Sequence, residues 1–118
     1  MRIAFAVFDN EKMIMDESFG RSKFFFVYDT ERETWEQYEN VQNLKAPQGA
    51  GLQAAQTVVN ANVDIIISKN IGPKAFDLLR SQNIKIYSTD EKDVKLALKL
   101  FLEGKLQELK DPNQFGMG

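Results

Sequence analysis

The stretch Ile3-Ala4-Phe5-Ala6-Val7-Phe8, which ends at Asp9-Asn10, decides the fold that this sequence predicts. Six consecutive apolar residues, some of them β-branched or aromatic, are typical of a strand that is buried on both faces. Such a strand lies in the interior of its sheet. A second run of this kind, Val63-Asp64-Ile65-Ile66-Ile67-Ser68, predicts a second central strand. We therefore expect these two strands to be neighbours.

Three weaker strands and three helices surround this pair in the sequence. Phe24–Tyr28 is aromatic and strand-like, whereas residues 34–41 are more polar and suit the edge of a sheet. Pro73 suits the first position of a helix, because the N–H that it lacks would have no partner there. The expected strands are 3–8, 24–28, 34–41, 63–68 and 84–87, and the expected helices are 52–60, 73–83 and a third between the caps Ser88-Thr89-Asp90 and Gly104.

Along the chain these elements follow the order βββαβαβα. Three consecutive strands followed by two right-handed βαβ crossovers predict an α/β fold with a five-stranded mixed sheet. The expected strand order is 3-2-1-4-5, with strand 2 antiparallel and helices on both faces, which is the ribonuclease H-like arrangement. We expect one domain over residues 1–110 and a flexible C-terminal tail over residues 111–118.

The composition excludes several kinds of catalyst. The 118 residues include no Cys and no His, so the chain has no disulfide, no thiolate nucleophile, no imidazole base, and no zinc or iron–sulfur site built from these ligands. The net charge of −2 argues against general affinity for nucleic acid or for a membrane surface. No apolar run is long enough to span a membrane. We expect a cytoplasmic protein that is not an enzyme.

The expected topology brings several loops to one edge of the sheet. Ligands of open α/β sheets bind at this edge, where helix N-termini direct N–H groups and a partial positive charge toward an anion. Arg21 and Lys69 can add full positive charges. The segments brought together are Asp9-Asn10, Phe19-Gly20-Arg21-Ser22, Gln48-Gly49-Ala50-Gly51, Lys69-Asn70-Ile71-Gly72-Pro73 and Ser88-Thr89-Asp90.

Other interpretations of individual residues stay open. Gly-rich helix starts occur in most α/β proteins, so Gly49-Ala50-Gly51 alone does not establish a site. A ribonuclease H-type nuclease needs clustered carboxylates, but only Asp9 lies at the expected edge, and Asp64 lies at the opposite one. Met13 and Met15 offer two thioethers for a soft metal, although such residues more often pack.

Four motifs in the right order and spacing give the chain a family resemblance. With them it resembles the dinitrogenase iron–molybdenum cofactor biosynthesis family over essentially the whole chain, through Leu106. The combination is specific, although each motif alone would not be. The motifs are Met1-Arg2-Ile3-Ala4-Phe5-Ala6-Val7, Ser18-Phe19-Gly20-Arg21-Ser22-Lys23-Phe24-Phe25, Gly49-Ala50-Gly51 and Asn70-Ile71-Gly72-Pro73-Lys74-Ala75-Phe76.

The resemblance implies a ribonuclease H-like domain and a small non-catalytic protein. Such a protein binds or carries an iron–molybdenum-type or other metal–sulfur cluster, and its partners are cofactor-assembly proteins. Carried over by position, the cofactor-binding residues are Phe19, Gly20, Arg21, Gly49, Ala50, Gly51, Asn70, Ile71 and Gly72.

Two positions depart from the family pattern. The family frequently has His before Phe-Gly and before Gly-Ala-Gly, where this chain has Ser18 and Gln48. Neither residue is a good ligand for a soft metal. An anionic cluster would then be held by backbone N–H groups and by Arg21, much as a phosphate is held.

A second function class also fits these residues. A small-anion or nucleotide-binding regulatory module would keep the same pocket without any metal chemistry. The edge strand near residues 34–41 could pair with a copy of itself, so we expect a monomer or a weak homodimer. We expect no nucleic acid and no membrane among the partners.

Overall fold

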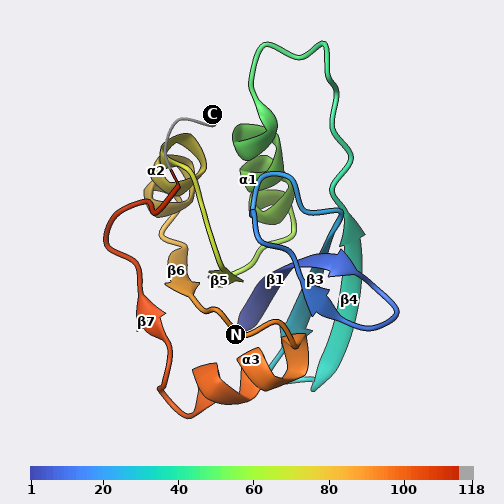
Figure 1. Cartoon of the computed structure of the whole chain (residues 1–118), viewed down its shortest axis with the longest axis vertical. Coiled ribbons are helices and arrows are strands. Elements are labelled where there is room, and N and C mark those ends of the chain that lie inside the picture. Colours follow the sequence, from blue (N-terminus) through green and yellow to red (C-terminus); the bar gives the residue numbers. More distant parts are fainter. Residues whose placement is uncertain (115–118) are drawn as a thin grey trace.

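A central sheet with helices on both sides organises the chain, as the computed structural model in Figure 1 shows. The structure describes residues 1–114. The helices are α1 (Ala50–Asn60), α2 (Pro73–Ser81) and α3 (Val94–Leu102), and the strands are β1 (Arg2–Asp9), β2 (Ile14–Met15), β3 (Phe24–Asp29), β4 (Thr34–Glu39), β5 (Ile65–Ser68), β6 (Lys85–Ser88) and β7 (Gln107–Glu108).

The sheet differs from the predicted one in its number of strands. It has seven strands, in the order β4-β3-β1-β5-β6-β7, with β2 paired to β1. The prediction of a five-stranded sheet is therefore wrong, because it lacks β2 and β7. Each of these has only two residues, too few to leave a periodic pattern. The expected mixed sheet is confirmed, since β1 pairs with β5 in parallel and with β3 antiparallel.

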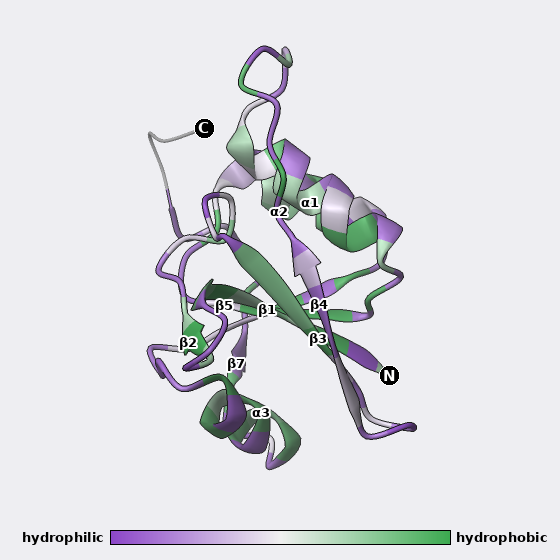
Figure 2. Cartoon of the chain, turned by 90° about the vertical axis from the view of Figure 1, so that its right-hand side faces the viewer, coloured by the Kyte–Doolittle hydropathy of each residue, from purple (hydrophilic) through white to green (hydrophobic). Residues whose placement is uncertain are grey.

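The side chains of β1 alternate between two hydrophobic layers. Ala4 and Ala6 pack in the layer that contains the buried residues of α1 and α2. Ile3, Phe5 and Val7 pack in the opposite layer, with the buried residues of α3. Helices therefore cover both faces, as predicted. In Figure 2 the central strands are green, and the edge strand β4, whose residues are mostly exposed, is paler.

The three helices begin in two different ways. Asp93 caps α3, because its Oδ1 accepts hydrogen bonds from the N–H groups of Lys95 at 2.9 Å and Leu96 at 3.4 Å. The caps predicted within Ser88-Thr89-Asp90 are wrong, since α3 begins only at Val94 and Thr89 accepts from the Glu91 N–H instead. By contrast, α1 and α2 have no side-chain cap.

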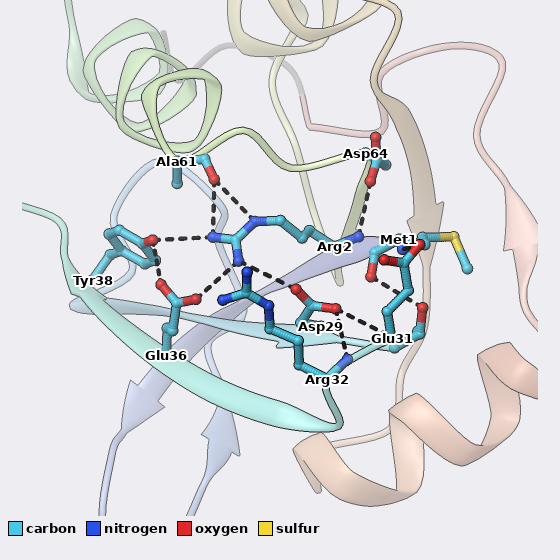
Figure 3. A network of polar contacts seen from close by, with 10 residues as sticks. Met1, Arg2, Asp29, Glu31, Arg32, Glu36, Tyr38, Ala61 and Asp64 are labelled. Carbon is cyan, nitrogen blue, oxygen red and sulfur yellow. Dashed lines mark hydrogen bonds and ion pairs between the residues drawn. The ribbon is translucent and has the colours of Figure 1, made fainter.

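A polar network closes the end of the sheet at which β1 begins, which we call the Arg2 end (Figure 3). The Arg2 guanidinium donates to Glu36 Oε1 at 2.9 Å, to the Tyr38 hydroxyl at 3.0 Å, and to the Ala61 carbonyl at 3.0 and 3.2 Å. Ala61 is the C-cap of α1. The positive charge of Arg2 thus lies at the negative end of that helix, where it is favourable.

The chain that follows β7 returns toward α2, as Figure 1 shows. The predicted tail over residues 111–118 lies partly outside the described residues, which end at 114. Within the described part, Asn113 accepts a hydrogen bond from the Ile71 N–H at 2.8 Å. The flexibility of the tail and the domain boundary at residue 110 stay predictions. No helix within residues 1–114 is long and apolar enough to cross a membrane.

Candidate functional site

A pocket lies at the loop end of the sheet, opposite the Arg2 end, between the first turns of α1 and α2. It takes residues from each of the three segments in which the sequence places a ligand. Gln114, from the segment that follows β7, also lines the pocket. We call it the edge pocket, and its lining residues are Ser18, Gly20, Arg21, Ala50, Gly51, Gly72, Lys74, Ala75 and Gln114.

The starts of α1 and α2 leave backbone N–H groups available at this pocket. The N-caps are Gly49 and Gly72, which have no side chain to accept a hydrogen bond, and neither helix has an acidic residue in its first turn. The first helical hydrogen bonds run from Gln53 N–H to the Gly49 carbonyl and from Phe76 N–H to the Gly72 carbonyl. N–H groups earlier in each helix have no intrahelical partner, and with the helix dipoles they favour an anion.

Glycines allow the pocket walls to meet. A Cβ atom placed on Gly20 would lie 3.0 Å from Gly51 Cα, closer than such contacts normally come. The turn that contains Gly20 therefore touches the first turn of α1 directly, backbone to backbone. Gly51 in turn lies against Ala75, since its added Cβ would be 3.5 Å from that of Ala75. Small residues thus bring three segments together around the pocket.

Two polar side chains that sequence reasoning missed hold the Gly20 turn in place. The Gln42 Nε2 donates to the Gly20 carbonyl at 2.8 Å and to the Ala50 carbonyl at 3.1 Å, so it joins the turn to α1. The Asn40 Nδ2 donates to the Gly20 carbonyl at 3.2 Å and to the Ser22 carbonyl at 2.8 Å. Both follow β4 in a polar loop, and nothing in their spacing marks them.

The positive charges of the pocket are Arg21 and Lys74. Arg21 is exposed and forms no hydrogen bond or ion pair with another residue in the described part of the chain. Lys74 follows Pro73 in the first turn of α2 and was not predicted as a site residue. Lys69, which we expected here, instead lies 3.7 Å from Glu17 and lines a different hollow. The available charge therefore comes from Arg21 and Lys74.

Several predicted residues support the pocket rather than line it. Phe19 and Ile71 are buried, with 0% and 1% of their surfaces exposed, and both belong to the core layer beneath α1 and α2. Asn70 accepts the Phe19 N–H through its carbonyl at 2.9 Å, and so ties two loops together. Gly49 contributes as the cap of α1. These residues fix the backbone around the pocket, Phe19 and Ile71 through buried side chains and Asn70 and Gly49 through their backbone.

The space in the edge pocket is small. Its volume is about 20 Å³, close to what a single water molecule requires. A more open groove of about 510 Å³ begins beside it and shares Arg21 and Ala50 with it. We call this the outer groove, and its lining residues are Arg21, Ser22, Lys23, Asn40, Gln42, Leu44 and Ala50. Only one corner of a larger ligand fits between the helix starts, and the remainder would lie in the outer groove.

The donors at the site suit an anion better than a bare metal ion. Within residues 1–114 no group of three or more His, Cys, Asp or Glu side chains could hold a metal ion. Ser18 lines the edge pocket but offers only a hydroxyl. Met15 is buried in the layer beneath α3, where it packs. Besides Ser18 and Gln114, the pocket is lined by the cations Arg21 and Lys74 and by the first turns of α1 and α2. Their charges and N–H groups can hold an anion.

Comparison with known proteins gives consistent matches over nearly the whole chain. The family described as dinitrogenase iron-molybdenum cofactor matches residues 1–104. An uncharacterized protein of Methanocaldococcus jannaschii is 32% identical over 92% of this chain and 91% of its own. The apo form of the orange protein from Desulfovibrio gigas has a TM-score of 0.87 and 30% identity, covering 96% of each chain. A NifB-like protein from Thermotoga has a TM-score of 0.81 and 28% identity, covering 98% of each.

Proposed function

Because this chain belongs to the dinitrogenase iron–molybdenum cofactor family, we propose that it is a non-catalytic binding and carrier protein for an anionic metal–sulfur cluster. The cluster is its cargo, and the edge pocket with the outer groove is the binding site. The observation that carries the proposal is the pair of helix starts without side-chain caps, which converge beside Arg21. A relative with the same fold, the orange protein, was solved as an apo form, which supports a ligand-bound state in this family.

The residues of the site fit an anionic cluster that they do not ligate directly. Backbone N–H groups donate hydrogen bonds to cluster sulfurs in many proteins, and such bonds stabilise the reduced, more negative forms. The first turns of α1 and α2 supply these donors, and Arg21 adds a guanidinium that can form two parallel hydrogen bonds. Ser18 and Gln48, which stand where the family frequently has His, are not needed for this mode of binding.

The charge and shape of the site indicate how a cargo is held. One anionic corner enters between the helix starts, where Gly51 and Ala75 leave space for it. The body of the cargo lies in the outer groove, beside Arg21 and Lys23. The lining of the edge pocket and of the outer groove includes no carboxylate among the described residues, so an anionic cargo meets no like charge there. Cofactor-assembly proteins in the cytoplasm are the partners that a carrier of this kind serves.

A second candidate function has its own observation. The edge pocket, at about 20 Å³, accommodates an oxygen of a phosphate more readily than a whole cluster. A regulatory module that binds a small anion or a nucleotide would use the same N–H groups and the same Arg21. The two candidates differ in their ligand and share one site.

One experiment distinguishes them. The purified protein is incubated with a molybdenum–copper sulfide cluster, with inorganic phosphate and with a nucleotide, and visible absorption and melting temperature are recorded. A bound ligand at about 100 times its Kd adds about 2.7 kcal/mol of stability. Stoichiometric colour supports the carrier, whereas stabilisation by phosphate or nucleotide alone supports the second candidate.

Matched variants test the site itself. We expect Arg21→Gln and Lys74→Gln each to weaken binding by about tenfold or more, because each removes a charged donor. Lys99→Gln is the control, since it removes the same charge from α3 on the other face of the sheet. Equal affinity in Arg21→Gln and Lys99→Gln would contradict the proposed site.

A further inference from the structure

The segment that follows β7 is fastened across the loop between β5 and α2. The Asn113 Oδ1 accepts from the Ile71 N–H at 2.8 Å, and its Nδ2 donates to the Lys69 carbonyl at 2.8 Å. The backbone N–H groups of Asn113 and Gln114 both donate to the Ile71 carbonyl, at 3.1 and 3.0 Å. Four hydrogen bonds therefore join this segment to one short loop, although Asn113 itself is exposed.

The same loop is held from its other side by the turn that forms the pocket. Phe19 N–H donates to the Asn70 carbonyl at 2.9 Å, and Ser18 and Asn70 form a parallel bridge. The loop before α2 thus lies between the Ser18 turn and the C-terminal segment. A residue of that segment is consequently placed beside the pocket.

Gln114 is that residue. Its side chain lines the edge pocket together with Ser18, and its Oε1 lies 3.5 Å from Ser18 Oγ across the opening. The walls contributed by α1 and α2 include Gly51 and Ala75, and Ala75 is buried in the core, with 1% of its surface exposed. The wall carried by Gln114 belongs instead to a segment in which none of residues 110–114 is buried.

We propose that Asn113 and Gln114 determine the size of the ligand that the edge pocket admits, an inference that rests on the function proposed above. Gln114 forms the movable wall, and Asn113 is the positioning residue that holds it there. With the wall in place, the pocket of about 20 Å³ takes only one small anionic corner. A bulkier metal–sulfur cluster must displace the segment and so loses its hydrogen bonds to Lys69 and Ile71.

The test compares a small and a large anion on the same variants. The probes are tetrathiomolybdate and a molybdenum–copper sulfide cluster, titrated into the full chain and into Gln114→Ala, Asn113→Ala and Lys110→Ala. Lys110→Ala is the control, because this residue lies in the same segment but its amine pairs with Glu108, at 3.2 Å, and it is not among the residues that line the edge pocket. Arg21→Gln is included as the variant that removes the proposed site.

We expect Gln114→Ala and Asn113→Ala to improve binding of the large cluster by about tenfold relative to tetrathiomolybdate. Lys110→Ala should leave this ratio unchanged. If Asn113 had a merely structural role, Asn113→Ala would lower stability without changing the ratio of the two affinities. Gln114→Ala is informative in addition, because it removes the side chain that forms the wall and leaves the four hydrogen bonds in place. An unchanged ratio in both variants, with binding lost in Arg21→Gln, would overturn the size-limiting role alone. Absence of binding to every variant would overturn both this inference and the proposed function.

Discussion

The two ends of the sheet treat their polar groups in opposite ways. At the Arg2 end the guanidinium donates hydrogen bonds to Glu36, to Tyr38 and to the carbonyl of Ala61, the C-cap of α1. At the loop end Arg21 has no such partner among the described residues, and the helices there begin without side-chain caps. Both ends belong to the same small fold and carry the same kind of cation.

Polar groups at the Arg2 end are paired within the fold, whereas those at the edge pocket are available for the ligand that we propose. Natural proteins normally cap helix starts, because unpaired N–H groups at a helix end are otherwise left to water. This chain does so at α3, with Asp93. Leaving both helices at the edge pocket uncapped keeps their N–H groups free for an anion. The following predictions test this contrast, beginning with the largest expected effect.

Replacing Phe19 by Ala should cost about 3–5 kcal/mol of stability. The ring is fully buried and lies 5.2 Å from the ring of Phe25, so its removal leaves a cavity in the core. Urea denaturation measures the loss, and Leu102→Ala is the control because Leu102 lies on α3 and is 55% exposed. A loss below about 0.5 kcal/mol, with weaker ligand binding, would show that Phe19 contacts the ligand and does not stabilise the core.

Replacing Arg2 by Met should lower stability by about 1–2 kcal/mol, because hydrogen bonds from a charged donor to Ala61 and Tyr38 are lost. Binding at the edge pocket should not change, since Arg2 lies at the opposite end. Chemical denaturation and ligand titration of the same variant measure both quantities. Weakened binding would show that the two ends are not independent.

Replacing Gly51 by Ala should raise stability by about 0.5–1 kcal/mol and lower ligand affinity. Ala is favoured over Gly within a helix, and the added Cβ would make only ordinary contact with Ala75. That Cβ also projects into the lining of the edge pocket, where it excludes part of the ligand. Melting temperature and titration together test this prediction, and a variant that gains stability with full affinity would contradict it.

Acid should weaken the Arg2 end first. The hydrogen bond from Arg2 lowers the pKa of Glu36, and the backbone N–H of Arg32 lowers the pKa of Asp29. Carboxylates with a lowered pKa stabilise the fold above their unfolded pKa, and this contribution is lost as the pH falls through the folded pKa. We therefore expect the stability difference between the parent chain and Arg2→Met to shrink below about pH 4, measured by urea midpoints. A difference that is constant with pH would contradict this account.

The sequence predicts the parts of the fold that leave a hydrophobic pattern. Ile3–Val7 and Ile65–Ser68 are buried runs, and their parallel pairing follows from the crossover rule. Phe8, which we expected to be buried with the first run, is 52% exposed. β2 and β7 depend instead on where neighbouring backbone happens to lie, since two residues carry no periodicity. The predicted cap of α3 lies a few residues before the observed one. Thr89 and Asp93 are both good cap residues, and only the packing of the helix decides between them.

The candidate site was predictable in its backbone but not in all of its side chains. The glycines at 20, 49, 51 and 72 mark segments that approach one another closely, and the topology brings them to one edge. Gln114 is far away in sequence and is held at the pocket by the hydrogen bonds of Asn113 and by its own N–H, which donates to the Ile71 carbonyl. Lys69 and Lys74 both flank the segment Asn70–Pro73, so the sequence alone does not tell which of them lines the pocket. In the structure Lys69 forms an ion pair with Glu17. These ion pairs and hydrogen bonds join residues far apart in the sequence, so they could not be predicted without the structure.

A nuclear magnetic resonance titration of the uniformly ¹⁵N-labelled chain with tetrathiomolybdate tests the central claim most directly. Binding at the loop end predicts that the amide signals of Arg21, Gly51 and Lys74 shift together and saturably, while those of Arg2 and Asp64 do not move. Shifts of equal size at both ends, or no shift at the three pocket amides at saturating anion, would contradict the account.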